Sequence, residues 1–327
     1  MSRLRAALIA ALIALVCVLS LMIGAVHIGP CDLWRGLIDN EGPAAFTVRV
    51  LRAPRLLCAL GAGAALGLSG TIFQMLLRNP LAAPDVMGFN AGAGFAVIVA
   101  ISTGVNWPMP LVAAMGGGVA AVLVAALSYR RGRMPDNLTL ILVGLGVGFS
   151  ASGLSTLLGL RLPDTLAAEA QRWITGSLSA RSWTHVAQIW GLGAVLCAML
   201  VVQVRGLGLL QLGPALAAGL GLHLGRSRAG LLATAVLLAA CGVAVAGPVP
   251  FVALMAGPLG IAITRARGPA ARLLAGAGSG ALITAAADLL ARALWLGVQL
   301  PVGVMTGLLG APYLLWFLSR AAKEGTL

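Results

Sequence analysis

Charged residues are scarce in this chain: they make up 9% of its 327 residues, and lysine occurs only once. Soluble globular domains carry about 25% charged residues, so this composition cannot supply a water-facing surface. Apolar residues make up 60% of the chain, and its mean hydropathy is +0.99. These values exclude a soluble enzyme, a disordered chain and a disulfide scaffold, and they predict a protein that crosses a membrane several times.

Recognisable catalytic and metal-binding motifs are also missing. The five cysteines occur singly, without a CxxC pair, and the three histidines are isolated, so the sequence predicts neither a zinc site nor a disulfide framework. It contains no GxxxxGK[ST] phosphate-binding loop, no HExxH and no GxSxG. We therefore expect no metal and no cofactor in this chain, and no enzymatic activity of its own.

Long apolar windows define the expected architecture. Backbone groups in hydrocarbon must be hydrogen-bonded internally, so each window of about 20 apolar residues predicts a helix. We expect an all-α polytopic membrane protein, a single domain over residues 1–327, with about ten transmembrane helices. The break at Gly247–Pro250 joins the seventh and eighth windows and leaves that part of the count open. The windows are Ala6–Ile28, Leu56–Leu77, Val86–Val105, Pro110–Tyr129, Leu138–Leu160, Thr184–Val204, Ala229–Gly247, Val249–Thr264, Leu273–Leu294 and Leu300–Leu318.

The net charge of +13 is distributed unevenly between the two predicted faces. The segments on the side of the termini hold 14 cations against three acids, whereas the other side holds eight cations against six acids. Cytoplasmic loops are enriched in Lys and Arg, so both termini are predicted to be cytoplasmic. The loop tryptophans fit an aromatic belt at the membrane interface.

Only two residues of the types Asp, Glu, Lys and Arg fall within the predicted spans, Asp288 and Arg292. Their spacing of four places them on one helix face, in the favourable order for an ion pair. Arg292 reaches the outer interface of its span, which argues against a proton relay at mid-membrane. Two roles stay open at this point: a structural ion pair and the docking of a partner.

Several short motifs follow one another along the chain. Together they resemble the permease subunits of FecCD-type ABC importers for iron–siderophore complexes, cobalamin and haem, over essentially the whole chain. The RxPR-like and RNPLA-like elements are specific in combination. The motifs are Leu51–Leu56, Gly67–Gly70, Phe73–Gln74, Arg78–Asp85, Trp173–Leu178, Ala246–Leu254, Leu300–Val304 and Gly310–Tyr313.

This resemblance implies a multi-pass subunit of a bacterial cytoplasmic membrane with three kinds of partner. These are a second permease, identical or paralogous, two cytoplasmic ATPase subunits that carry ATP and Mg, and an extracytoplasmic substrate-binding protein. The Trp173–Leu178 motif with Ala180–Trp183 is closest to the ferric enterobactin-like, siderophore branch. Cobalamin or haem import is the alternative, and a secondary transporter that does not use ATP is the alternative of another class.

The resemblance also implies roles for individual residues. Arg52, Arg55 and Arg292 correspond to arginines that dock the binding protein. As charges at the rim of an interface they would set register and association rate. The cytoplasmic gate would include Asn79, Leu81, Asn137 and Leu138, although Asn79–Pro80 also fits an ordinary turn.

The loop at about residues 205–228 resembles the coupling helix that lies in a groove of the ATPase. An amphipathic surface loop is the simpler alternative. The chain departs from the family pattern after Leu254. The family commonly has Pro-His or Pro-Gln there and an Arg three residues later, whereas this chain has Gly257–Pro258 and Ile261. The residues expected to couple to the ATPase are Gly213, Pro214, Ala217, Leu220 and Gly221.

Overall fold

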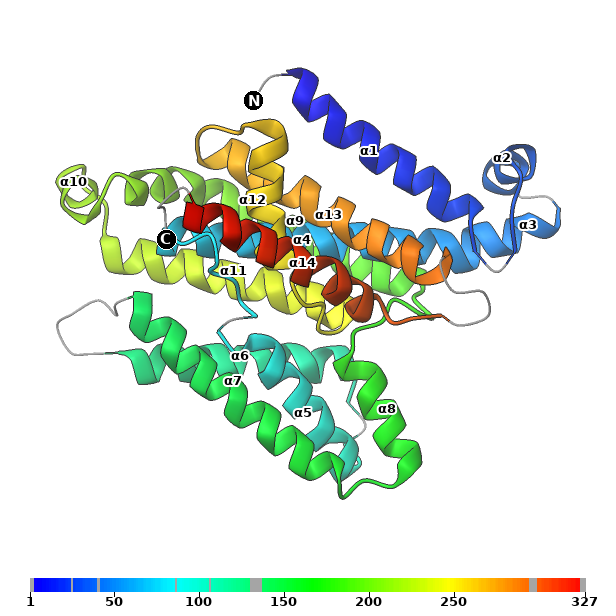
Figure 1. Cartoon of the computed structure of the whole chain (residues 1–327), viewed down its shortest axis with the longest axis horizontal. Coiled ribbons are helices and arrows are strands. Elements are labelled where there is room, and N and C mark those ends of the chain that lie inside the picture. Colours follow the sequence, from blue (N-terminus) through cyan, green and yellow to red (C-terminus); the bar gives the residue numbers. More distant parts are fainter. Residues whose placement is uncertain are drawn as a thin grey trace.

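Helices are the only regular elements in the described part of the chain (Figure 1). The computed structural model describes residues 3–24, 26–39, 42–85, 87–105, 107–129, 137–293 and 299–323. The elements are α1 (Arg3–Met22), α2 (Pro30–Ile38), α3 (Pro43–Phe46), the π-helix η1 (Thr47–Arg52), α4 (Ala53–Leu77), α5 (Phe89–Thr103), α6 (Met109–Ser128), α7 (Asn137–Gly159), α8 (Asp164–Ile174), α9 (Trp183–Gln211), α10 (Pro214–Gly219), α11 (Leu224–Ala246), α12 (Val252–Thr264), α13 (Pro269–Ala293) and α14 (Val302–Lys323).

The predicted all-helical membrane architecture is confirmed at the level of its apolar helices. Seven helical segments among the described residues are long and apolar enough to cross a membrane, and the shorter apolar helices are Phe89–Thr103, Val252–Thr264 and Val302–Phe317. Each of the ten predicted windows overlaps one of these helices. Crossing by the three shorter helices, and therefore a count of ten, stays a prediction.

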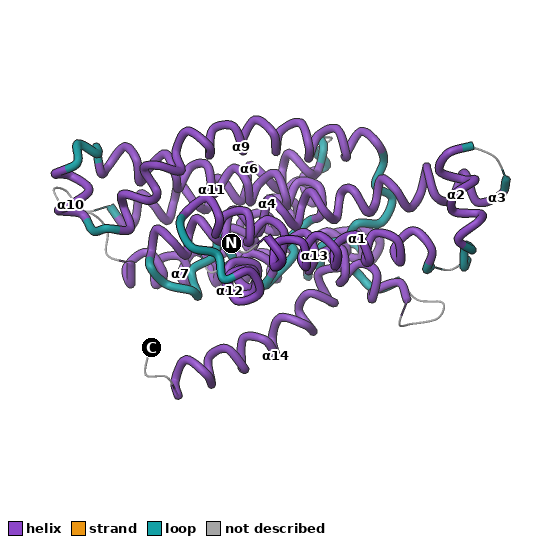
Figure 2. Tube along the Cα trace, turned by 90° about the horizontal axis from the view of Figure 1, so that it is seen from above, coloured by secondary structure: helices purple, strands orange, loops and turns teal. Residues whose placement is uncertain are grey.

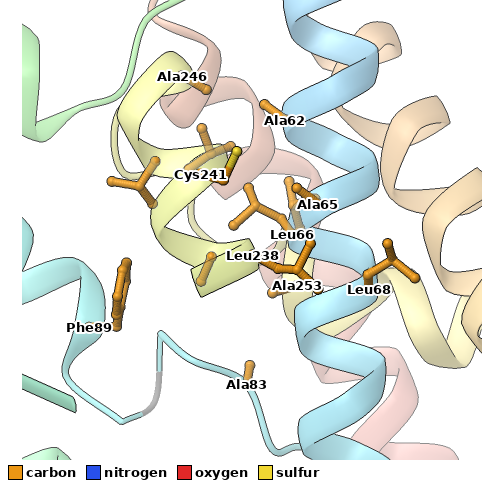
Figure 3. Packing of buried hydrophobic residues seen from close by; sticks show 14 of the residues in the cluster. Ala62, Ala65, Leu66, Leu68, Ala83, Phe89, Leu238, Cys241, Ala246 and Ala253 are labelled. Carbon is orange, nitrogen blue, oxygen red and sulfur yellow. The ribbon is translucent and has the colours of Figure 1, made fainter. Parts of the chain in front are cut away.

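Helix α4 runs through the middle of the bundle and packs against α13, α11, α12 and α9. Its glycines permit backbone contact: a Cβ at Gly63 or Gly67 would overlap the carbonyl oxygen of Gly280 or Gly276 on α13. Small residues of this kind allow helices in a membrane to approach closely. On another face of α4, Leu66 lies beside Leu238 and Cys241 of α11 in the buried core (Figure 3).

Helices α5, α6, α7 and α8 lie together on one side of this bundle (Figure 1). Helix α6 packs against both α5 and α11, and so connects the two groups of helices. The connection from α11 to α12 runs between them, with a positive φ of 72° at Gly247 and 66° at Phe251. The backbone N–H of Gly303 donates to the carbonyl of Gly176 at 3.3 Å, and a Cβ at Gly176 would overlap the Pro248 carbonyl. Three motifs that are distant in sequence therefore meet here.

The structure gives a physical account of the Gly257–Pro258 departure. Pro258 lies inside α12 and has no N–H, so it cannot donate to the carbonyl of Leu254 as a helical residue would. Gln74 of α4 supplies the missing donor, with its Nε2 3.0 Å from that carbonyl oxygen. Gly257 makes room for this contact, because a Cβ there would overlap Gln74 Oε1.

Helix packing predicts that Gly67→Ala destabilises the protein. The added methyl would force α4 away from α13, and overpacking of this kind costs about 1–3 kcal/mol. Gly118→Ala on α6 is the matched control, because its Cβ would have no atom within 4 Å and helix propensity gains equally in both variants. Thermal unfolding of purified protein in detergent should give a clearly lower midpoint for Gly67→Ala than for Gly118→Ala. Equal midpoints would contradict the packing.

Candidate functional site

Asp288 of α13 lies at the centre of a cluster of arginines that comes from two helices. Its side chain is 1% exposed. Arg55 of α4 approaches it with Nε at 2.9 Å from Oδ1 and 3.1 Å from Oδ2, and with Nη2 at 2.8 Å from Oδ1. Arg55 also donates through Nη1 to Gln299 Oε1 at 3.3 Å. The guanidinium and carboxylate thus form a buried, charge-assisted pair.

Arg292 joins the same carboxylate from the next turn of α13. Its Nε lies 3.2 Å from Asp288 Oδ2, which confirms the ion pair that the spacing of four predicted. Its Nη2 donates to Ser20 Oγ of α1 at 2.6 Å. Arg292 therefore links α13 to α1 as well as balancing Asp288.

Arg52 binds the C-terminal end of α1 rather than an acid. Its Nη1 donates to the carbonyls of Leu21 at 2.7 Å and Met22 at 2.9 Å, and its Nη2 donates to the carbonyl of Val26. The last carbonyls of a helix lack partners within the helix and carry partial negative charge, so a cation is favourable there. The π-helix η1 leads directly into α4 at this point, and the N–H of Ala53 donates to the Val48 carbonyl.

The structure therefore brings Arg52, Arg55 and Arg292 together at one end of the bundle. Two guanidiniums pair with the one carboxylate and the third, that of Arg52, binds backbone carbonyls, which leaves a net charge of +2. Arg52 and Arg55 are only 6% and 8% exposed, which corrects the expectation of charges at an exposed rim. The sequence could not reveal the Arg55–Asp288 pair, because 233 residues separate its members. The signal in the sequence was Asp288, the acid inside a predicted span, together with arginines predicted on the outer side.

Two of the predicted belt tryptophans have additional structural roles near this cluster. Trp183 Nε1 donates to the carbonyl of Arg49 at 3.1 Å, which ties α9 to η1. Arg181 lies over the Trp173 ring, with Cζ 6.0 Å from the ring centroid, and its Nη2 donates to the Ser177 carbonyl at 3.0 Å. The segment around Trp183 therefore contacts both η1 and the Trp173 motif.

The predicted gate residues Asn79 and Leu81 lie in a tight turn after α4. Asn79 Oδ1 accepts the backbone N–H of Leu81 at 2.9 Å, and the Asn79 carbonyl accepts the N–H of Ala82 at 3.1 Å. These are the bonds of an Asx-type turn, so the simpler alternative describes the local structure. The side chains of Asn137 and Leu138, the other predicted gate residues, lie outside the described part of the chain.

The predicted coupling segment contains a short helix with an exposed apolar face. Helix α10 covers Pro214–Gly219, between Gly213 and Gly221, which both have positive φ. Ala217 is buried, whereas Leu212, Leu216 and Leu220 are 56–62% exposed. Leu216 lies on α10, whereas Leu212 and Leu220 flank it on either side, and Gly213 with its positive φ separates Leu212 from the helix.

Arg78 fixes the position of this segment relative to α4. Its Nη2 donates to the carbonyls of Leu210 and Gln211 at 3.1 and 3.0 Å, at the end of α9. The sequence placed Arg78 in a motif but gave it no contact, so this link is new.

Asp85, after the Asn79 turn, is a second acid that sequence analysis left without a role. Asn90 Nδ2 donates to its Oδ1 at 2.8 Å. Asp85 Oδ2 and Asn90 Oδ1 are inaccessible to solvent and have no hydrogen-bond partner among the described residues. Burial raises the pKa of the Asp85 carboxyl to about 7, although hydrogen bonds from the Phe251 N–H and from Asn90 oppose the shift.

Comparisons with known proteins agree with the motif pattern. The model of the FecCD transport family matches residues 12–320. The ferric enterobactin transport system permease protein FepG of Escherichia coli (strain K12) is 38% identical over 307 residues, which cover 92% of this chain and 91% of FepG. The Fe(3+)-citrate import system permease protein YfmE of Bacillus subtilis (strain 168) is 35% identical over 324 residues, covering 97% and 95% of the two chains.

A solved structure of a metal-chelate type ABC transporter in an inward-facing conformation is similar in fold. Its TM-score is 0.82 with 25% sequence identity, over 95% of this chain and 97% of that chain. The arrangement of helices described above is therefore shared with a transporter subunit.

The Asp85 environment predicts a pH-dependent stability. Because the native carboxyl binds its proton more tightly than the unfolded one, the free energy of unfolding should fall as pH rises from about 4 to about 7 and level off above. Asp85→Asn is neutral throughout, so its unfolding midpoint should change less than that of the unmodified protein between pH 5 and pH 8. Asp164→Asn, an exposed acid at the start of α8, should keep the full change. A full change in Asp85→Asn would contradict the role of burial.

Proposed function

The chain belongs to the FecCD transport family, and from this premise we propose that it is the membrane permease subunit of an ATP-binding-cassette importer for a ferric siderophore. The observation that carries the proposal is the match over residues 12–320 together with the conserved helix arrangement. The names of the relatives, which refer to ferric enterobactin and Fe(3+)-citrate, support an iron chelate as the substrate. Cobalamin and haem are the alternatives within the same family.

The proposed topology has ten membrane crossings, with both termini in the cytoplasm of a bacterium. The surplus of cations on the side of the termini supports this orientation. The proposed partners are a second permease, two ATPase subunits that bind ATP and Mg, and an extracytoplasmic binding protein. ATP hydrolysis belongs to the partner subunits in this proposal.

The arginine cluster would be the docking site of the binding protein. Its net charge of +2 is not balanced by any further acid bonded to it among the described residues. Acidic side chains of a partner could therefore complete the cluster at the end of the bundle where α2 and α3 lie (Figure 1). Because the guanidiniums are held by internal bonds, they would meet the partner in a fixed geometry.

The α10 segment would transmit ATP hydrolysis to the helices. Its exposed leucines fit a groove of the ATPase, and Arg78 connects the preceding helix to the Asn79 turn. Gly213, Pro214, Ala217, Leu220 and Gly221 would shape this contact. Asn79, Leu81, Asn137 and Leu138 would form the gate beside it.

The proposed function predicts that Leu216→Asp uncouples the transporter. A carboxylate at position 216, among the exposed leucines, could not enter an apolar groove without loss of its hydration. Purification of the reconstituted complex should show loss of the ATPase subunits and at least a tenfold decrease in substrate-stimulated ATP hydrolysis, a threshold of about 1.4 kcal/mol.

Leu160→Asp, at a leucine after α7 that is 81% exposed compared with 62% for Leu216, is the control and should keep both properties. Equal behaviour of the two variants would contradict the coupling role of α10. Uptake by the intact chain driven by a proton gradient without ATP would contradict the importer proposal itself.

The docking site predicts a specific effect of Arg52→Gln. Glutamine keeps an N–H donor for the α1 carbonyls but removes one positive charge. The association rate with the binding protein should fall several-fold at low ionic strength, and the difference should shrink at 1 M salt, where the Debye length is about 3 Å.

Arg35→Gln on α2 removes an exposed charge at the same end and should change the rate less. Matching elution volumes and unfolding midpoints would show that both variants are folded. Identical rates and salt dependence for Arg52→Gln and the unmodified chain would contradict docking at the cluster.

A further inference from the structure

A cavity of about 700 Å³ lies at the end of the bundle opposite the arginine cluster. It is formed by the last turns of α4, the end of α9, the middle of α12, the first turn of α13 and the end of α14. Its lining combines polar side chains, including Gln74 and Asn79, with the apolar side chains of Met75, Ile261 and Phe317. The cavity is therefore amphipathic.

The cavity carries positive charge and no acidic side chain. Arg78 and Arg272 line it, and none of its lining residues is Asp or Glu. The bonds that Arg78 makes go to backbone carbonyls, which do not neutralise its charge. Arg272 Nε is inaccessible to solvent and has no hydrogen-bond partner among the described residues.

The location of the cavity indicates which anion it could receive. It lies where the apolar helix α4 ends and α13 begins, which is the level of phospholipid head groups for helices that cross a bilayer. Helix α14 diverges from the other helices toward its C-terminal end, the part that carries Phe317 (Figure 2). The cavity is therefore bounded on one side by a helix that stands away from the bundle.

We propose that this cavity binds the phosphate of an anionic phospholipid head group, with Arg272 as the principal partner and Arg78 as the second. A guanidinium can donate two parallel hydrogen bonds to a phosphate, and both arginines line the cavity. Met75, Ile261 and Phe317 provide apolar contact for the glycerol and the first methylenes of the lipid. The family pattern has an arginine at the position of Ile261. The apolar side of the cavity is therefore a feature of this chain and not of the family pattern.

The test measures thermal stability of the full-length chain with defined lipids. Purified protein receives vesicle-derived phosphatidylglycerol or phosphatidylcholine in mixed micelles, and the unfolding midpoint is recorded. We expect phosphatidylglycerol to raise the midpoint and phosphatidylcholine to have little effect, because a ligand that binds only the native state stabilises it. Arg272→Gln should lose at least half of the phosphatidylglycerol shift, whereas Arg272→Lys, which keeps the charge but not the paired donors, should lose less than Arg272→Gln.

Arg267→Gln is the matched control, since Arg267 is exposed between α12 and α13 and does not line the cavity. It should keep the full shift, which separates the site from general attraction of lipid to a cationic protein. Equal losses in Arg267→Gln and Arg272→Gln would overturn the proposal. An equal shift with phosphatidylcholine would overturn it as well. A shift produced by inorganic phosphate alone, and unchanged by added lipid, would assign the site to free phosphate instead.

Discussion

Helices α4 and α13 approach so closely that no Cβ fits at Gly63 or Gly67 beside the carbonyls of Gly280 and Gly276. This backbone contact places Arg55 of α4 within hydrogen-bond distance of Asp288 on α13. A wider separation would leave Asp288 buried without its strongest partner. The glycine contact and the ion pair therefore depend on each other, and the rest of the bundle is arranged around them.

Asp288 also determines how the outer helices are held. A buried charge that loses its partner costs several kcal/mol, so Arg55 and Arg292 are both constrained by the single carboxylate. Arg292 extends this constraint to Ser20 of α1, and Arg52 adds bonds to the last carbonyls of the same helix. Helix α1 has few buried residues of its own. Its outer end is fixed mainly by these arginine contacts rather than by a large apolar interface.

Features of the fold that depend on neighbouring residues were predictable from the sequence. Apolar length predicted the helices, and a spacing of four predicted the Asp288–Arg292 pair. Contacts between distant residues were not predictable: no local pattern pairs Arg55 with Asp288, directs Arg52 to α1, or brings Gln74 to the Leu254 carbonyl beside Pro258. The family resemblance named three arginines that the structure brings together, but their burial could not be derived from it, because burial depends on how α1 and α13 pack.

The position of α4 connects the two ends that the proposed importer uses. Its 25 residues span about 37 Å, with Arg55 in its first turn and Arg78 directly after its last. Because α4 is packed backbone to backbone against α13, it can move as a rigid element more easily than it can bend. A shift of α4 caused by a partner at the arginine cluster would therefore carry Arg78 with it. Arg78 holds the carbonyls of Leu210 and Gln211, and Gln211 lies three residues before α10 begins, so this contact links the end of α4 to the proposed coupling helix.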